Sequence, residues 1–266
     1  ISPTLTVQNN YVLSAPVNMQ TLQFVENLVG SQTYSIEIQN VGDCWANTTT
    51  LFGEFALPEV AQAGDLVINE LLVDPVSGGK DWIEIYNNSD KLIDLFNGQI
   101  ADFDDDTIAN IKVINQHILI GAGEYVVLGE DISQIAQHYS TVVPDNLYEM
   151  DLPSYSNDSG TVYLIQNNTI MDRVVYQDDW HFQLLDNTDG VSLERIDPNG
   201  ESSDGNNWHS AAEAIGFATP GLVNSQFYPA IVNGEFSYTS DIVSPDNDGY
   251  QDVLQINYKL TEPGYV

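Results

Sequence analysis

Residues 64–88 constrain the fold of this chain more than any other segment. They contain two runs, 66–71 and 81–86, in which apolar and polar residues alternate, and a Pro-Val-Ser-Gly-Gly sequence stands between them. Alternation with a period of two is typical of β-strands, because successive side chains point to opposite faces. The Gly-Gly pair suits a turn, so the two runs are predicted to be neighbouring antiparallel strands.

The rest of the chain repeats this pattern of short strands, separated by Gly, Asn, Asp and Pro. Asn167-Asn168 stands between two strand-like runs and predicts a tight hairpin, because Asn tolerates positive φ. A helical pattern occurs at residues 131–139, where Asp131 and Gln134 have the spacing of a capping box. The chain is therefore predicted to be all-β, a β-sandwich with one short helix.

Composition limits the partners of such a protein. The chain has 266 residues, with 6 Lys and Arg against 39 Asp and Glu, which gives a net charge of −33. A surface of this kind repels phosphates, which argues against nucleic acid and anionic membranes as partners. No apolar run is long enough to span a bilayer, so membrane insertion is not expected. The single cysteine excludes an internal disulfide.

Several sequence blocks follow one another in an order that resembles a known family. After Ile68-Asn69-Glu70 come residues 82–89, 93–95, 123–128, 190–196, 207–208 and 218–224. The ordered set is similar to the lamin-tail domain of secreted Bacteroidetes proteins. That resemblance implies an immunoglobulin-like β-sandwich, which is not usually an enzyme.

The resemblance and the strand pattern together predict three segments. Residues 1–58 resemble the C-terminal part of a bacterial immunoglobulin-like module. Residues 59–227 would form the lamin-tail domain, and residues 228–266 would start a further immunoglobulin-like unit. Alternatively, the two ends complete one sandwich with the middle domain inserted between them.

Glu84 stands among aromatic residues on one face of a predicted strand and invites a catalytic interpretation. The structural alternative is a carboxylate that accepts hydrogen bonds from backbone N–H groups or pairs with Arg195, and Glu70 and Glu194 are interpreted in the same way. No second acid has a diagnostic spacing, and the four histidines lack metal-ligand spacing. No catalytic residue is therefore assigned, and the chain is not expected to be an enzyme.

The sequence Ser-Pro-Asp-Asn-Asp-Gly-Tyr-Gln-Asp at residues 244–252 predicts a calcium site. Asp246, Asp248 and Asp252 are the candidate ligands, since Ca²⁺ prefers six to eight oxygens and a glycine turn lets nearby carboxylates converge. The motif is similar to part of the calcium loops of dockerin and thrombospondin-type repeats. It is also similar to the opening of immunoglobulin-like modules in secreted Bacteroidetes proteins, where it would only shape a turn.

These observations favour a non-catalytic module, extracellular or on the cell surface, for adhesion, display or domain spacing. Its partner would be a protein or a glycan at the cell surface. One alternative is an accessory module of a larger secreted hydrolase or nuclease. Another is a carbohydrate-binding module, for which Trp180-His181-Phe182 is a candidate sugar contact.

Overall fold

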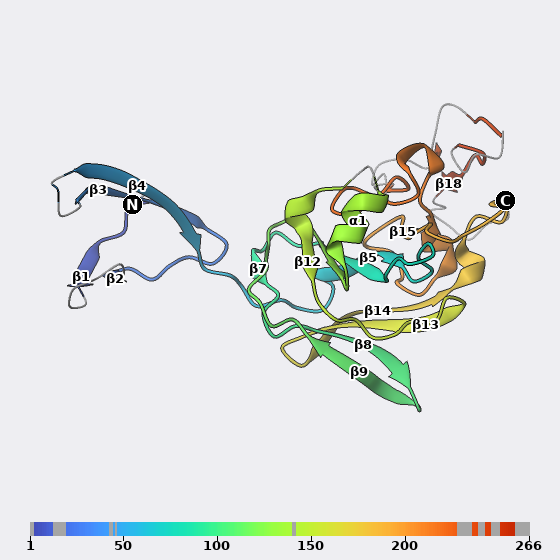
Figure 1. Ribbon diagram of the computed structural model, residues 1–266, viewed down its shortest axis with the longest axis horizontal. Coiled ribbons are helices and arrows are strands. Elements are labelled where there is room, and N and C mark those ends of the chain that lie inside the picture. The colour runs from blue at the N-terminus through green and yellow to red at the C-terminus, as the bar shows by residue number, and fades with distance from the viewer. Residues whose placement is uncertain are drawn as a thin grey trace. The chain divides into compact units, whose positions relative to one another are not determined.

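The fold is described from a computed structural model. It describes residues 3–12, 20–42, 45, 47–139, 142–227, 236–238, 243–245 and 251–258. The elements in these ranges are short strands, one α-helix and four 3-10 turns (Figure 1).

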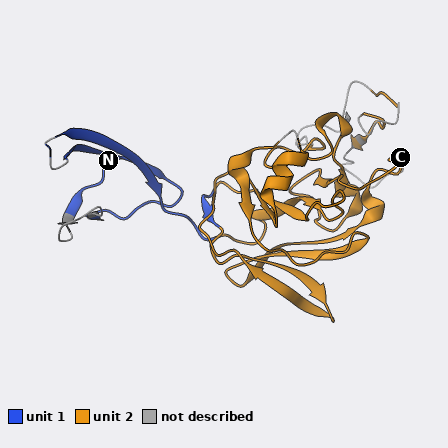
Figure 2. Cartoon of the chain, viewed as in Figure 1, with its two compact units in different colours: residues 1–60, 91–94 blue, residues 61–90, 95–266 orange. Residues whose placement is uncertain are grey.

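The chain divides into two compact units (Figure 2). Unit 1 comprises residues 1–60 and 91–94, and unit 2 comprises residues 61–90 and 95–266. Unit 1 contains two antiparallel pairs of strands. In the first, β1 (Val7–Val12) pairs with β2 (Gln20–Phe24), and in the second, β3 (Thr33–Gly42) pairs with β4 (Thr48–Ala56). The short strand β7 (Ile93–Asp94) also belongs to this unit. Tyr34 is buried, and its ring stacks on Phe55 at 5.4 Å between centroids.

Unit 2 is built on a six-stranded sheet with the order β12-β11-β6-β5-β15-β16. Its strands are β5 (Leu66–Leu72), β6 (Trp82–Asn87), β11 (Tyr125–Gly129), β12 (Leu147–Glu149), β15 (Leu193–Arg195) and β16 (Trp208–Ser210). All neighbours are antiparallel except β11 and β12. β5 therefore lies between a neighbour close in sequence and β15, which follows more than a hundred residues later.

A second sheet of four strands has the order β14-β13-β8-β9. Its strands are β8 (Gln99–Asp104), β9 (Thr107–Val113), β13 (Ser159–Gln166) and β14 (Thr169–Gln177). Figure 1 shows it as a separate layer beneath the first sheet, and β13 and β14 contact β5. The two sheets form a β-sandwich, as the sequence predicts.

A short helix covers part of the other face of the first sheet. Helix α1 (Ile132–His138) begins after Asp131, whose carboxylate accepts hydrogen bonds from the N–H groups of Ser133 and Gln134. Its Ile135 and the following Tyr139 pack with a buried group from the sheet, Leu72, Trp82 and Val127. The predicted helix at residues 131–139 is confirmed.

Both hairpin predictions can be tested against the structure. Residues 66–71 and 81–86 lie in β5 and β6, which are antiparallel neighbours, so this prediction is confirmed. Asn167 and Asn168 both have positive φ and join β13 to β14, which confirms the predicted tight turn. Asp105 and Asp106 also have positive φ, and they connect β8 to β9.

The remaining elements are short. They are β10 (Leu119–Ile120), β17 (Phe236–Tyr238), β18 (Ile256–Tyr258) and the 3-10 turns η1 (Pro144–Asn146), η2 (Asp178–Trp180), η3 (Gly205–Asn207) and η4 (Glu213–Ile215). β17 and β18 form an antiparallel pair. The existence of a separate unit from residue 228 onward stays a prediction.

Candidate functional site

The predicted calcium ligands fall mostly outside the described part of the chain. Asp246 and Asp248 lie outside the described residues, whereas Asp252 is described. The Ser244 N–H donates a 2.8 Å hydrogen bond to the Gln251 carbonyl, so the two ends of the motif are joined through their backbones. The calcium site therefore stays a prediction.

Arg195 is buried and paired, but with a partner other than the one that the sequence suggested. Its Nη1 lies 2.7 Å from Oδ2 of Asp172 on β14. The expected pairing with Glu84 or Glu70 is wrong, because Arg195 and Glu194 are consecutive in β15 and point to opposite faces of the sheet. Arg195 thus faces β14, and the three glutamates face the side covered by α1.

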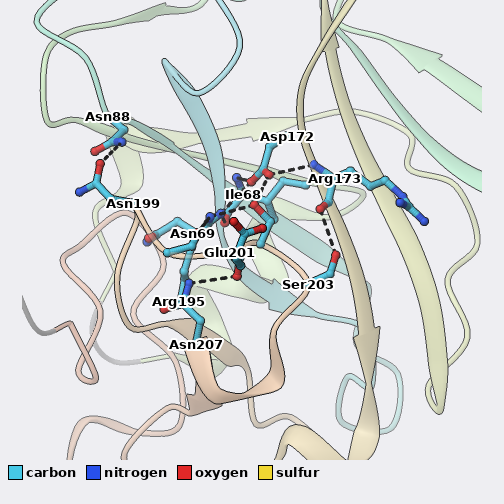
Figure 3. Close-up of polar contacts among 12 residues, drawn as sticks. Ile68, Asn69, Asn88, Asp172, Arg173, Arg195, Asn199, Glu201, Ser203 and Asn207 are labelled. Atoms are coloured by element: carbon cyan, nitrogen blue, oxygen red, sulfur yellow. Dashed lines mark hydrogen bonds and ion pairs between the residues drawn. The ribbon is translucent and has the colours of Figure 1, made fainter. Parts of the chain in front are cut away.

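The guanidinium of Arg195 uses all five of its N–H donors within the protein. Figure 3 shows Arg195 together with two of its partners, Ile68 and Asp172. Nη1 donates to Asp172 and to the Ile68 carbonyl, Nη2 to the Gly200 carbonyl and to Ser202 Oγ, and Nε to the Asp197 carbonyl. A polar depression of about 340 Å³ lies over this pair. With every donor engaged, Arg195 orders the loop at residues 197–202 and has no N–H left for an anion.

The three glutamates form one row across adjacent strands. Glu70 on β5 lies opposite Glu84 on β6 and opposite Glu194 on β15. Each of the three residues is 0% exposed. We call these residues the glutamate row. In the described ranges, no cluster of His, Cys, Asp and Glu is arranged to hold a metal ion.

A later loop, residues 217–226, covers the glutamate row and gives each carboxylate one backbone donor. The Thr219 N–H donates to Glu70 at 2.9 Å, the Gly221 N–H to Glu84 at 2.6 Å, and the Gln226 N–H to Glu194 at 2.8 Å. This confirms the structural interpretation in which Glu84 satisfies backbone N–H groups. We call this segment the covering loop.

Amide side chains join the covering loop to the sheet. A bulge in β5 at Asn69 disturbs its register with β6. The Asn69 Nδ2 donates to Glu84 Oε1 and Asn224 Oδ1, and the Asn224 Nδ2 donates to the carbonyls of Asn69 and Arg195. Asn224 thus satisfies backbone carbonyls of both β5 and β15.

The geometry at Thr219 requires a proton on the glutamate row. Its Oγ1 lies 2.7 Å from Glu194 Oε1 and 3.2 Å from Glu70 Oε2. A hydroxyl has one hydrogen, so it can donate to only one of these oxygens, and the other contact needs a protonated carboxyl as donor. Burial, with Glu194 nearby, raises the pKa of Glu70 to about 8. Burial also raises the pKa of Glu84 and that of Glu194.

A groove on unit 2 gathers aromatic side chains. It has a volume of about 650 Å³ and is lined by residues of η2, η3 and β16 and by the segment after η2, including Trp180, Phe182, Trp208 and His209. The rings of Trp180 and Trp208 stack at 6.1 Å, and those of Phe182 and His209 lie 5.5 Å apart. We call it the aromatic groove. It contains the Trp180-His181-Phe182 segment, which sequence analysis names as a candidate sugar contact. The sequence did not indicate that β16 adds Trp208 and His209 to the same groove.

The comparison with protein families decides what the sandwich is. The family described as Lamin Tail Domain matches residues 59–178. Residues 59–178 belong to the lamin tail domain family. The match includes Glu70 and Glu84, but Glu194 and the covering loop lie beyond its end.

Among solved structures, the chain is similar to a DUF4876 family protein from Bacteroides thetaiotaomicron VPI-5482, at 11% identity and a TM-score of 0.34, over 79% of this chain and 87% of that chain. A comparison with curated proteins gives no match. In the described residues, no helix has the length and apolar character needed to cross a bilayer.

Sequence reasoning missed two features of unit 2. One is Asp172, an acid inside the apolar strand pattern of β14, which is a signal that a buried partner is needed. The other is the role of the covering loop. Its Ala-Thr-Pro-Gly block was recognised, but its docking depends on backbone N–H groups, which residue types do not reveal.

Proposed function

We propose that the chain is a non-catalytic module, extracellular or on the cell surface, whose lamin tail domain serves adhesion, display or domain spacing. The observation that carries this proposal is the state of the glutamate row. Glu70, Glu84 and Glu194 are the acids that sequence analysis interpreted as structural carboxylates, and all three are buried and accept hydrogen bonds from the covering loop.

The arrangement of the glutamate row suits a structural role. General acid–base catalysis needs a group that can reach the proton of a bound substrate. Glu84 instead accepts hydrogen bonds on both oxygens, from Asn69 and from Gly221. A substrate would have to displace the covering loop to reach it, so we interpret the row as the means by which this loop is fixed to the sheet.

The charge of the chain supports the choice of partners. A net charge of −33 disfavours nucleic acids and anionic lipid surfaces and leaves neutral glycans and proteins as candidates. An extracellular location is part of the same proposal, since the sandwich module and its partner class both suit a cell surface.

The test is a turnover screen of the chain against glycans, peptides, esters and nucleic acids. We expect no turnover above that of a heat-denatured sample. Activity that Glu84→Gln abolishes, while the near-UV circular dichroism and the unfolding midpoint stay those of the wild type, would show that the row is catalytic. Glu213→Gln, at an exposed carboxyl, is the matched control.

A further inference from the structure

We propose that the aromatic groove binds a neutral glycan chain. This inference rests on the proposed adhesive function and specifies its ligand. It begins from the size of the groove, about 650 Å³, which lies within the range of about 300–1,000 Å³ that is usual for ligand sites.

The platform of the groove is fixed before any ligand arrives. Trp208 is 2% exposed, and its Nε1 donates to the Ser202 carbonyl. Trp180 stacks on it and is partly exposed. A Cβ at Gly205 would lie 2.6 Å from Trp180 Nε1, so only glycine lets the backbone of η3 approach this ring so closely. An indole held in this way offers a flat apolar surface at little entropic cost.

The second aromatic edge is fixed by one hydroxyl. Ser210 Oγ accepts from the Phe182 N–H at 2.9 Å and lies 2.9 Å from His181 Nδ1. The segment after η2 is thereby attached to β16, which places Phe182 beside His209. Burial lowers the pKa of His181 to about 4, so its imidazole is neutral at physiological pH.

The polar residues of the groove suit a ligand that carries hydroxyl groups better than one that carries charged groups. Gln177, Gln183 and Asn206 are among the residues that line the groove. Amides both donate and accept, as sugar hydroxyls do, whereas the C–H face of a pyranose can pack on an indole. The described lining includes Asp179 and no Lys or Arg. With the net charge of −33, this disfavours uronate, sialylated or sulfated chains.

The test measures binding of defined hexasaccharides to the chain by calorimetry and tryptophan fluorescence. The neutral probes are cellohexaose, xylohexaose, mannohexaose, maltohexaose and chitohexaose, and the acidic probe is hexagalacturonate. We expect one-to-one binding of at least one neutral probe, a change in fluorescence because Trp180 lines the site, and at least tenfold weaker binding of hexagalacturonate.

Variants locate the binding. Trp180→Ala should weaken it at least tenfold, and the matched control Trp45→Ala, at a tryptophan that is 83% exposed in unit 1, should leave it unchanged. If Trp180→Ala lowers the unfolding midpoint, Gln183→Ala carries the test, because this exposed side chain lines the groove and its loss should weaken binding severalfold with the fold intact.

Three results would overturn the proposal: no binding of any neutral probe, neutral binding that survives in Gln183→Ala and in a folded Trp180→Ala, or displacement of the bound probe by a proline-rich peptide that binds the groove more tightly. None of these would bear on the turnover screen. Turnover lost in Glu84→Gln would in turn overturn the proposed function and leave the binding data standing, so the two failures are distinguishable.

Discussion

Raising the pH from 7 to 9 is expected to destabilise unit 2 through the glutamate row. The pKa of Glu70 is about 8 in the folded protein and about 4.5 in the unfolded chain, so the folded state binds more protons between these values. The contribution of the Glu70 carboxyl to the free energy of unfolding is fully present below pH 4.5 and is lost as the pH rises through 8. The raised pKa values of Glu84 and Glu194 act in the same direction.

The size of the effect follows from the linkage relation. For one carboxyl with a folded pKa of about 8, the free energy of unfolding falls by about 1.4 kcal/mol between pH 7 and pH 9, and Glu84 adds to this. The window is chosen to avoid His181. Its folded pKa of about 4 costs stability only as the pH falls below its unfolded value of 6.5.

The assay is urea unfolding at constant ionic strength, followed by tryptophan fluorescence. Three of the four tryptophans, Trp82, Trp180 and Trp208, belong to unit 2. Glu70→Gln should flatten the pH dependence, because a glutamine amide can donate to Thr219 as a protonated carboxyl does. Glu213→Gln should keep the wild-type slope. A wild-type midpoint that is equal or higher at pH 9, or an unchanged slope in Glu70→Gln, would refute the reasoning.

Two further predictions concern single side chains. Arg195→Met should lower the free energy of unfolding by about 3–5 kcal/mol, because it leaves Asp172 buried and unpaired; Arg173→Met, at an exposed arginine, is the control, and equal effects in the two variants would contradict the assigned role. Calorimetric titration should show one Ca²⁺ site that is lost in Asp248→Ala and for which Mg²⁺ is a poor substitute, because Mg²⁺ prefers a tighter octahedral shell. Equal binding by wild type and variant would leave the motif as a turn.

The sandwich could be predicted because its signals are local. The alternation in β5 and β6, the Asn167-Asn168 turn and the Asp131 cap each depend on residues within a few positions of one another. Residue type alone fixes face, turn and cap in such cases, so no tertiary information was needed.

The polar contacts could not be assigned in the same way, because they join distant segments. Arg195 was expected to have a buried acidic partner, and it does, but the choice among acids depends on which strands are adjacent. Strand alternation could already have separated Arg195 from Glu194 and its row. The aromatic groove could not be predicted without the tertiary structure, because Trp208 and Gly205 contact Trp180 only when η3 and β16 lie beside η2.

The position of β5 between β6 and β15 affects where this chain can be cut. The family match ends at residue 178, but a fragment that stops there would lose β15 and the covering loop. β5 would become an edge strand with seven residues that the intact chain buries, and its unpaired backbone could template contacts with other copies. Such a fragment should aggregate, whereas a fragment that continues to residue 227 keeps β5 paired with β15.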